Sequence, residues 1–493
     1  MSEDAYFDPD LADIRFGCGR APDIAAPRSI AQMMERLRGP DLAARAFPIG
    51  SFDSLRQDLT AYDGLRNKER ELSRELANTG PQDSSTPQDS PTRQERTAAF
   101  KRIQKQVEVQ KRAARLREVQ SFGHTLQRRI GTQDGLRERL VAFWADHFTA
   151  HAKRPRLRPA DATYIEDAIR PHVAGRFADM LRAAATHPVM LFYLDQHVSV
   201  GPNSPAARAR VSAGRPSGAM NENLAREMLE LHTLGVGGPY GQGDVQQLAA
   251  LLTGLSYAPA KGFVFRAGLA EPQAETVLGK RYGGAKAKLD DIYAALDDLA
   301  AHPATSRHIA RKMARHFTSD QPSEDLIRAL DAAFTQSGGD LAALTQALLR
   351  HPDAWVREPG NVKQPFDFVA SALRALGTHP RHIPVMKRRR MQQQFLTPLA
   401  HMGQAWNRPP GPDGWPEEDA AWIVPQRLAA RIQWAMTVPF ALMKLLPDPD
   451  DFMRSALGAR ARSAPQLGFA AKGAETRAIG IGLVLLSPAF QRM

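Results

Sequence analysis

The chain has 493 residues, of which 43% are hydrophobic, which is enough to build one or two packed cores and excludes global disorder. Lysine and arginine outnumber aspartate and glutamate by 65 to 53, and the resulting formal charge of +12 favours anionic partners without indicating a fold. The single cysteine, Cys18, excludes an intramolecular disulfide, a zinc site with several thiolates, a cysteine-ligated iron–sulfur cluster within one chain and a CxxCH haem attachment. Any metal must therefore be held mainly by histidines and carboxylates.

The N-terminal segment "MSEDAYFDPDLADIRFGCG" is acidic at its start and has no apolar region, so we expect no signal peptide. The longest apolar run, "AIGIGLVLL", is too short to cross a bilayer. These features predict a cytoplasmic protein by default, and export together with a signal-bearing partner stays open.

Helical periodicity dominates and alternating β-branched runs are scarce, so the predicted fold is all-α or nearly so, a multi-helix globular protein. We divide it into residues 1–66, an N-terminal helical part of the main domain; 67–120, a charged insertion; and 121–493, the main helical domain. The insertion has a polar Ser/Pro/Gln/Asp stretch at 79–92, which predicts a disordered tip, between flanks that predict a projecting helical hairpin. Four His-Pro pairs, at His187, His302, His351 and His379, predict element boundaries, because proline is tolerated in the first helical turn.

The stretch "NENLAREMLELHTLG", residues 221–235, combines an amphipathic helix with an unusual charge density. At about 100° per residue, Glu222, Arg226 and Glu230 form an i, i+4, i+8 ladder. Asn223 and Glu227 lie on the same arc, whereas His232 leaves the other side with the apolar residues. Because Glu230 and His232 are nearly opposed, this helix alone does not form the Glu-x-x-His half of a di-iron site.

A second histidine, His147 in "RERLVAFWADHFTAH", also lies within an apolar helical stripe. One interpretation is that His147 and His232 are core residues, each hydrogen-bonded to a backbone carbonyl or a side chain. The other is that they enter one buried pocket that carboxylates also reach. A third charged stretch, "RHIARKMARHF" at 307–317, carries Arg311 and Arg315, which we predict to pair with the acidic ladder.

Several motifs occur in the order typical of one family: "FWADHF", "HPVMLFYLDQ", "GPNS", "NENLAREMLELHTLGV", "DVQQLAALLTG", "IARKMARHFTSD", "GWPEEDAAWI" and "SPAFQ". The chain thus resembles the bacterial domain of unknown function 1800 family, a resemblance that supplies no reaction. It implies a possible partner from the domain of unknown function 1501 family, whose gene is frequently adjacent. Two departures from the family pattern are the absence of an export signal and Leu255 in place of the usual tryptophan after "LTG".

Three functions compete. The first is an enzyme or a metal- or ligand-binding protein, with cofactor and substrate unspecified. Its pocket would gather the candidate catalytic residues His147, Glu222, Arg226, Glu227, Glu230 and His232, with Asn223 and either Asp195 or Asp244. A metal ion in this pocket would be held by His147, Glu227 and Glu230. The second is a non-catalytic scaffold that docks a partner through the loop around Trp415 and Trp422 and through the hairpin. The third, a nucleic-acid binder, rests on net charge and on the basic run Lys387, Arg388, Arg389 and Arg390. No GxSxG, GxxxxGK[ST] or HExxH motif supports a standard hydrolase, nucleotide or zincin site.

Overall fold

The computed structural model of the chain describes residues 5–78, 93–357, 360–383, 386–443 and 445–493. The predicted disordered tip, 79–92, lies outside the described residues. The N-terminal third contains α1 (Pro9–Ile14), α2 (Ile30–Arg38), α3 (Leu42–Ala46), α4 (Phe52–Asn78), α5 (Arg93–Gly131), α6 (Gly135–His147) and α7 (Pro159–Tyr164).

The middle of the chain contains α8 (Phe177–Thr186), α9 (Pro188–Tyr193), α10 (Pro205–Ser212), α11 (Asn223–Glu227), α12 (Gln242–Leu251), four short strands, α13 (Leu289–Ala301), α14 (Pro303–Phe317), α15 (Glu324–Gln336) and α16 (Leu341–Arg350). The C-terminal part contains α17 (Pro365–Ala375), α18 (Arg388–Met391), α19 (Thr397–His401), α20 (Asp419–Trp422), α21 (Pro425–Ala435), α22 (Val438–Leu442), α23 (Pro449–Leu457), α24 (Pro465–Lys472), α25 (Arg477–Leu486) and α26 (Pro488–Gln491). Single π-helical turns cover Ile165–Ile169, Met228–His232 and Gln392–Leu396.

The predominantly α-helical prediction is confirmed. Across the described ranges, β-structure beyond isolated bridges is limited to two antiparallel pairs, β1 (Leu255–Ala258) with β2 (Gly262–Phe265) and β3 (Gln273–Val277) with β4 (Lys280–Gly284). Leu255 begins β1, pairs with Phe265 and is buried. None of the described helices is both long and apolar enough to cross a membrane.

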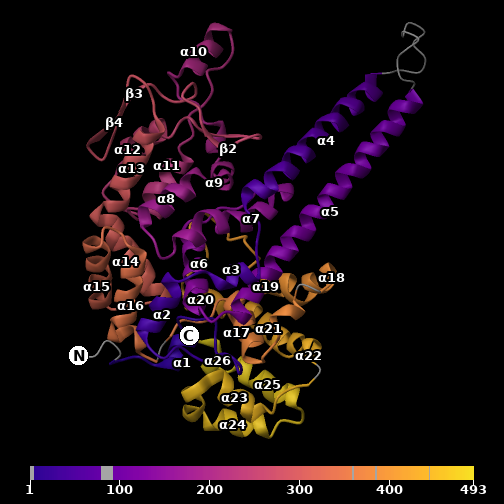
Figure 1. Cartoon of the computed structure of the whole chain (residues 1–493), viewed down its shortest axis with the longest axis vertical. Coiled ribbons are helices and arrows are strands. Elements are labelled where there is room, and N and C mark those ends of the chain that lie inside the picture. The colour runs from indigo at the N-terminus through magenta and orange to yellow at the C-terminus, as the bar shows by residue number, and fades with distance from the viewer. Residues whose placement is uncertain (1–4, 79–92, 358–359, 384–385, 444) are drawn as a thin grey trace.

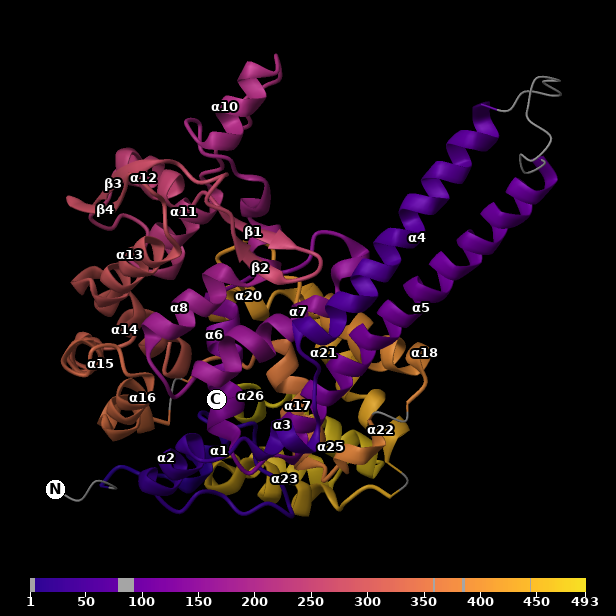
Figure 2. The same cartoon turned by 45° about the horizontal axis from the view of Figure 1, so that its top comes forward.

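Helices α4 and α5 lie side by side and project from the body as a hairpin (Figures 1 and 2). Both helices run without a break through residues 66 and 120, so the proposed insertion does not begin and end at helix ends. The first turns of α4 bury Phe52, Leu55 and Leu59, and the last turns of α5 bury Phe122 and other apolar residues. The hairpin is therefore rooted in the body at both ends, and the three-part domain division stays a prediction.

Two hydrophobic clusters form the interior of the body. The first gathers apolar side chains from α1 to α16, including those of α6, α8 and α14. The second gathers the end of α5 with α17, α19 and α21 to α26. The chain passes between the two clusters more than once. The end of α5 packs on α17 and belongs to the second cluster, and the next helix, α6, belongs to the first.

The four His-Pro pairs all begin helices, as predicted. His187, His302, His351 and His379 are the N-cap residues of α9, α14 and the 3₁₀ turns Pro352–Trp355 and Pro380–His382. In each case Nδ1 accepts a hydrogen bond from the backbone N–H two residues later, at 3.1 to 3.3 Å. Each imidazole thus takes the place that Ser or Asp side chains usually occupy at a helix start.

Candidate functional site

A cavity of about 150 Å³ lies at the boundary between the two hydrophobic clusters. Helix α6 supplies one wall, and its cavity-facing residues recur at helical spacing: Glu138, Ala142, Ala145 and Asp146. The alanines leave space that larger side chains would fill. The other walls come from α7 and the π turn after it (Asp161, Tyr164, Glu166), α14 (His316), α17 (Phe366, Asp367) and the 404–415 loop (Trp406, Asn407, Trp415).

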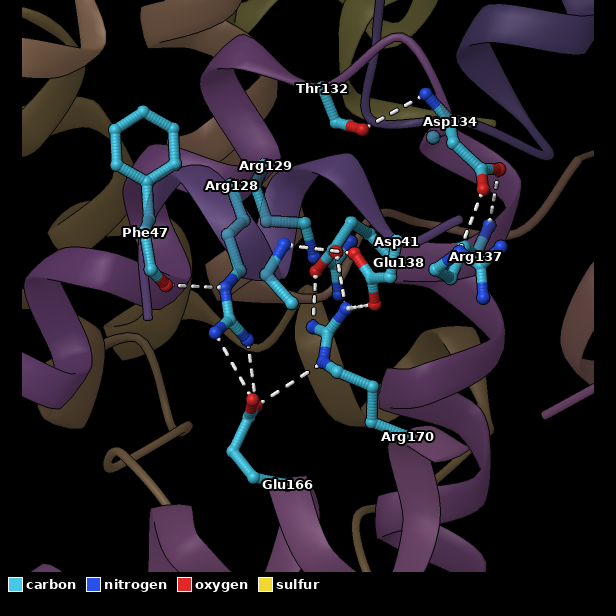
Figure 3. Close-up of polar contacts among 12 residues, drawn as sticks. Asp41, Phe47, Arg128, Arg129, Thr132, Asp134, Arg137, Glu138, Glu166 and Arg170 are labelled. Atoms are coloured by element: carbon cyan, nitrogen blue, oxygen red, sulfur yellow. Dashed lines mark hydrogen bonds and ion pairs between the residues drawn. The ribbon is translucent and has the colours of Figure 1, made fainter. Parts of the chain in front are cut away.

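The first set of charges around this cavity is centred on Arg170, which Figure 3 shows between Glu138 and Glu166. Its guanidinium donates to both carboxylate oxygens of Glu138 at 2.8 and 2.9 Å, to Asp41 at 2.9 Å and to Glu166 at 3.2 Å. Arg128 also holds Glu166, at 2.7 and 3.1 Å. Burial opposes ionisation of Glu138, but the charge and hydrogen bonds of Arg170, together with the charges of Arg128 and Arg129, outweigh it, so the pKa of Glu138 is lowered.

A second set of charges forms a chain across the opposite wall. Asp367 accepts from Arg129 at 2.8 Å and from Arg139. Arg139 also donates to His316 Nε2 at 3.2 Å, and His316 Nδ1 lies 3.0 Å from both oxygens of Glu417.

Asp146 differs from the other carboxylates that line the cavity. Glu138, Asp161, Glu166 and Asp367 are each within 4 Å of an arginine nitrogen, whereas Asp146 has no such ion pair in the described part of the chain. Its Oδ1 accepts from the Trp415 backbone N–H at 2.8 Å. Burial raises the pKa of Asp146 to about 7, although Lys312 opposes the shift.

The loop that carries Trp415 approaches Asp146 closely because residue 414 is glycine. Gly414 has a φ of +87°, and a Cβ there would lie 2.6 Å from both carboxylate oxygens of Asp146. Any larger residue would combine a strained backbone with a clash against the carboxylate.

A second cavity carboxyl, Asp161, is also shifted. Burial raises the pKa of Asp161 to about 8, and Arg408, at 3.0 Å, offsets this only in part. Its Oδ1 accepts from the Ala152 backbone N–H at 2.6 Å. Carboxyls whose pKa burial raises toward neutral pH are suited to act as general acids or bases on a bound molecule.

The two predicted histidines point inward, as their apolar stripes indicated, but neither lines this cavity. Their ring centroids lie 6.2 Å apart, and His147 Nε2 donates to the His232 carbonyl at 3.2 Å. Burial first, and then Lys312, lower the pKa of both rings, that of His232 to about 3; no carboxylate contributes. The interpretation of core histidines is thus the one that this geometry favours.

The acidic ladder forms as predicted, with Arg226 at 3.2 Å from Glu222 and 3.4 Å from Glu230. The prediction of one continuous α-helix over this stretch is wrong, however, because α11 ends at Glu227 and the next turn, Met228–His232, is π-helical. The pairing with the basic stretch is also wrong. Arg311 lies 3.7 Å from Glu324, and Arg315 lies 3.2 Å from Glu418.

The remaining candidates have other partners. Asn223 begins α11, and its N–H donates to the Asn221 side chain at 2.8 Å. Asp195 pairs with Lys153 at 2.7 Å, and Asp244 caps α12 by accepting from Gly241 at 2.9 Å. Burial, Glu230 and Asp413 raise the pKa of Glu227. Among the described side chains, no three His, Cys, Asp or Glu residues are placed to hold a metal ion, so nothing here supports the set His147, Glu227 and Glu230.

The loop around Trp415 and Trp422 turns both tryptophan rings toward the interior, whereas Ile423 and Val424 directly after it are exposed, so docking of a partner through this region stays a prediction. Trp415 lines the cavity, and Trp422 is buried with its indole N–H donating to the Pro416 carbonyl at 3.0 Å. The basic run 387–390, in contrast, is exposed. Sequence reasoning missed the cavity residues, although one signal was present: α6 has buried charges at Glu138 and Arg139 within an apolar helix.

The fold and this site define a class of protein: a mostly helical protein with a cavity in which all but one of the lining carboxylates that the structure describes form ion pairs with arginines. The family model described as "Protein of unknown function (DUF1800)" matches residues 52–492. The chain belongs to that family, which confirms the resemblance inferred from its motifs. Searches of curated proteins and of solved structures find no match.

Proposed function

We propose that this protein binds a small organic cation, such as a primary amine, in the cavity beside α6, with Asp146 as the counter-ion. The observation that carries the proposal is that Asp146 is the cavity carboxylate without an arginine partner. The arginines around the other carboxylates satisfy their charge, so a cation gains most by lying next to Asp146.

The rest of the lining suits such a ligand. Trp406 and Trp415 provide aromatic faces, on which organic cations are stabilised. The cavity volume, about 150 Å³, is close to that of a protein cavity known to hold benzene. We therefore expect a ligand of roughly five to eight non-hydrogen atoms. If the bound molecule reacts, Asp146 and Asp161 are the groups that give or take its proton.

A charge series of equal shape tests the proposal: isopentylamine, isopentanol and isovalerate, titrated calorimetrically at pH 8, where Asp146 is ionised. We expect the amine to bind wild-type protein and the alcohol and acid to bind at least tenfold more weakly. Asp146→Asn should weaken amine binding by at least tenfold, because a charge-assisted hydrogen bond contributes about 1.5–3 kcal/mol.

Glu230→Gln is the matched control, since it removes a carboxylate that lies in the surface ladder and not in the cavity. It should bind the amine as wild type does. Equal binding of amine and alcohol, or unchanged amine binding by Asp146→Asn, refutes the proposal.

A different observation favours partner docking as a second candidate. Val424, the N-cap residue of α21, is followed at i+4 and i+8 by Leu428 and Ile432 within the helix, and the three residues are 37, 38 and 44% exposed. Exposed apolar stripes of this kind are typical of protein interfaces. If the partner is a protein of the domain of unknown function 1501 family, Leu428→Glu should abolish its co-elution in size-exclusion chromatography, and retained co-elution contradicts this use of α21.

A further inference from the structure

A second cavity, of about 290 Å³, lies at the base of the hairpin. It is enclosed by the segment before α4, the first turns of α4, the lower part of α5 and helix α7. Its polar lining consists of Ser54, Arg117, Gln120, Ser121, His124 and Thr163. No carboxylate lines it, whereas several line the cavity beside α6, with which it shares Ile49.

The donors of this second cavity come mostly from one face of α5. Arg117, Ser121 and His124 follow at i, i+4 and i+7, so their side chains lie along the same side of the helix. His124 Nδ1 donates to the Pro48 carbonyl at 2.6 Å, which holds the 48–50 segment against α5 and leaves Nε2 as the ring nitrogen able to meet a ligand.

Arg117 also makes an ion pair, to Asp58 on α4. That pair uses Nη1, and a guanidinium has five N–H groups, so donors remain for a ligand. Asp58 does not line the cavity. Its carboxylate orients the arginine without placing negative charge in the cavity lining.

The exposed part of α5 adds a general positive charge near this cavity, although its basic stripe lies on the face of the helix opposite to the cavity-lining residues. Residues 93–117 contain nine Lys or Arg residues and two Glu residues, a net charge of +7 on one projecting helix. Lys101, Lys105, Arg112 and Arg115 lie on one face of it at about 100° per residue, and all four are exposed. A surface of this kind raises the local concentration of anions and their association rate.

We infer that the cavity at the hairpin base binds the phosphate group of a small soluble phosphate ester. Arg117 supplies the charge and Ser121 supplies a hydroxyl donor, within a lining that contains no competing carboxylate. The hydroxyls of Ser54 and Thr163 donate to the Ser51 and Ala160 carbonyls. This site is separate from the proposed cation site and opposite to it in charge, so either inference can fail without the other.

The experiment measures the ³¹P linewidth of inorganic phosphate and of glycerol 3-phosphate in the presence of the full chain at constant ionic strength. Both signals should broaden with wild-type protein. Arg117→Gln should weaken binding at least tenfold, and Ser121→Ala should weaken it severalfold while keeping the positive charge.

Arg115→Gln is the matched control, because it removes the same charge two residues away on the same helix without touching the cavity lining. It should change the dissociation constant less than twofold. Equal losses in Arg115→Gln and Arg117→Gln show non-specific attraction and overturn the inference. It is also overturned if wild-type protein broadens neither signal, or if it binds vesicles containing phosphatidic acid but neither soluble probe.

Discussion

Asp146→Asn should stabilise the protein at alkaline pH. The asparagine oxygen can still accept from the Trp415 N–H, and the side chain keeps its shape, so the substitution mainly removes a charge. In wild-type protein that charge lies in a low-dielectric wall without an arginine partner. Ionised Asp146 therefore lowers the free energy of unfolding of the wild-type protein, and the variant lacks this destabilisation. Such destabilising groups are common at functional sites.

The size of the effect follows from the pKa of Asp146, which is 3.8 for the ordinary group and about 7 in the folded protein. Because a tenfold change in a proton's binding constant corresponds to about 1.36 kcal/mol, ionised Asp146 reduces the free energy of unfolding by at most about 4 kcal/mol. Asp146 is only partly buried where it faces the cavity, and solvent there screens its charge, so we expect about 2 kcal/mol.

The pH dependence distinguishes this cause from better packing. Between pH 3.8 and 7 the folded state binds a proton that the unfolded state releases, so wild-type stability decreases as the pH rises through this window. The advantage of Asp146→Asn should be small at pH 4, grow up to pH 7 and then remain constant.

Urea denaturation at pH 4, 5.5, 7 and 8 measures the effect, with Asp195→Asn as control. Asp195 is an exposed partner of Lys153, and its substitution should change stability by less than about 1 kcal/mol. If Asp146→Asn is less stable than wild type at pH 8, or gains equally at every pH, then Asp146 is not a buried, unpaired charge.

Two further predictions concern the histidines and the hairpin. His147 and His232 stay neutral in the folded protein, whereas they take up protons in the unfolded chain, so the free energy of unfolding should fall as the pH drops below 6.5, by about 1.4 kcal/mol per pH unit for each histidine. The plot of unfolding free energy against pH should be less steep for His147→Phe. An unchanged steepness contradicts the assignment of His147 as a neutral core histidine. Excision of residues 69–106, joined by a short Gly/Ser linker, should leave the cooperative melt intact, because the Asp58–Arg117 contact places residues 68 and 107 at matching heights and the buried Val107 and Val119 are retained. A large fall in melting temperature shows instead that the upper hairpin supports the core.

Local signals in the sequence predicted the features that depend on neighbouring residues. The helical class, the four His-Pro helix starts and the Glu222–Arg226–Glu230 ladder all arise from spacings of four residues or fewer, and the structure contains each of them. The π turn at Met228–His232 was not predictable from a wheel, because the wheel assumes the regular spacing that a π turn interrupts.

The cavity depends on partners that are far apart in the chain. Arg170 and Glu138 are 32 residues apart, and Arg129 and Asp367 are 238 apart. A single sequence gives charges and periodicity, but it does not show which arginine neutralises which carboxylate. The unpaired state of Asp146 is the property that makes it a site candidate, and that property exists only after the other pairs have formed.

Asp146 and His147 show why the predicted site was one residue away from the cavity. Consecutive residues on a helix point about 100° apart, so Asp146 faces the cavity while His147 enters the packed first cluster. Burial favours the neutral form of both side chains, so it raises the pKa of Asp146 and lowers the pKa of His147. Space distinguishes them: a ligand can reach the carboxyl beside the cavity, whereas the ring of His147 is enclosed by Trp144, Phe148 and Phe177. A shifted pKa in this fold therefore points to function only where the cavity adjoins the shifted group.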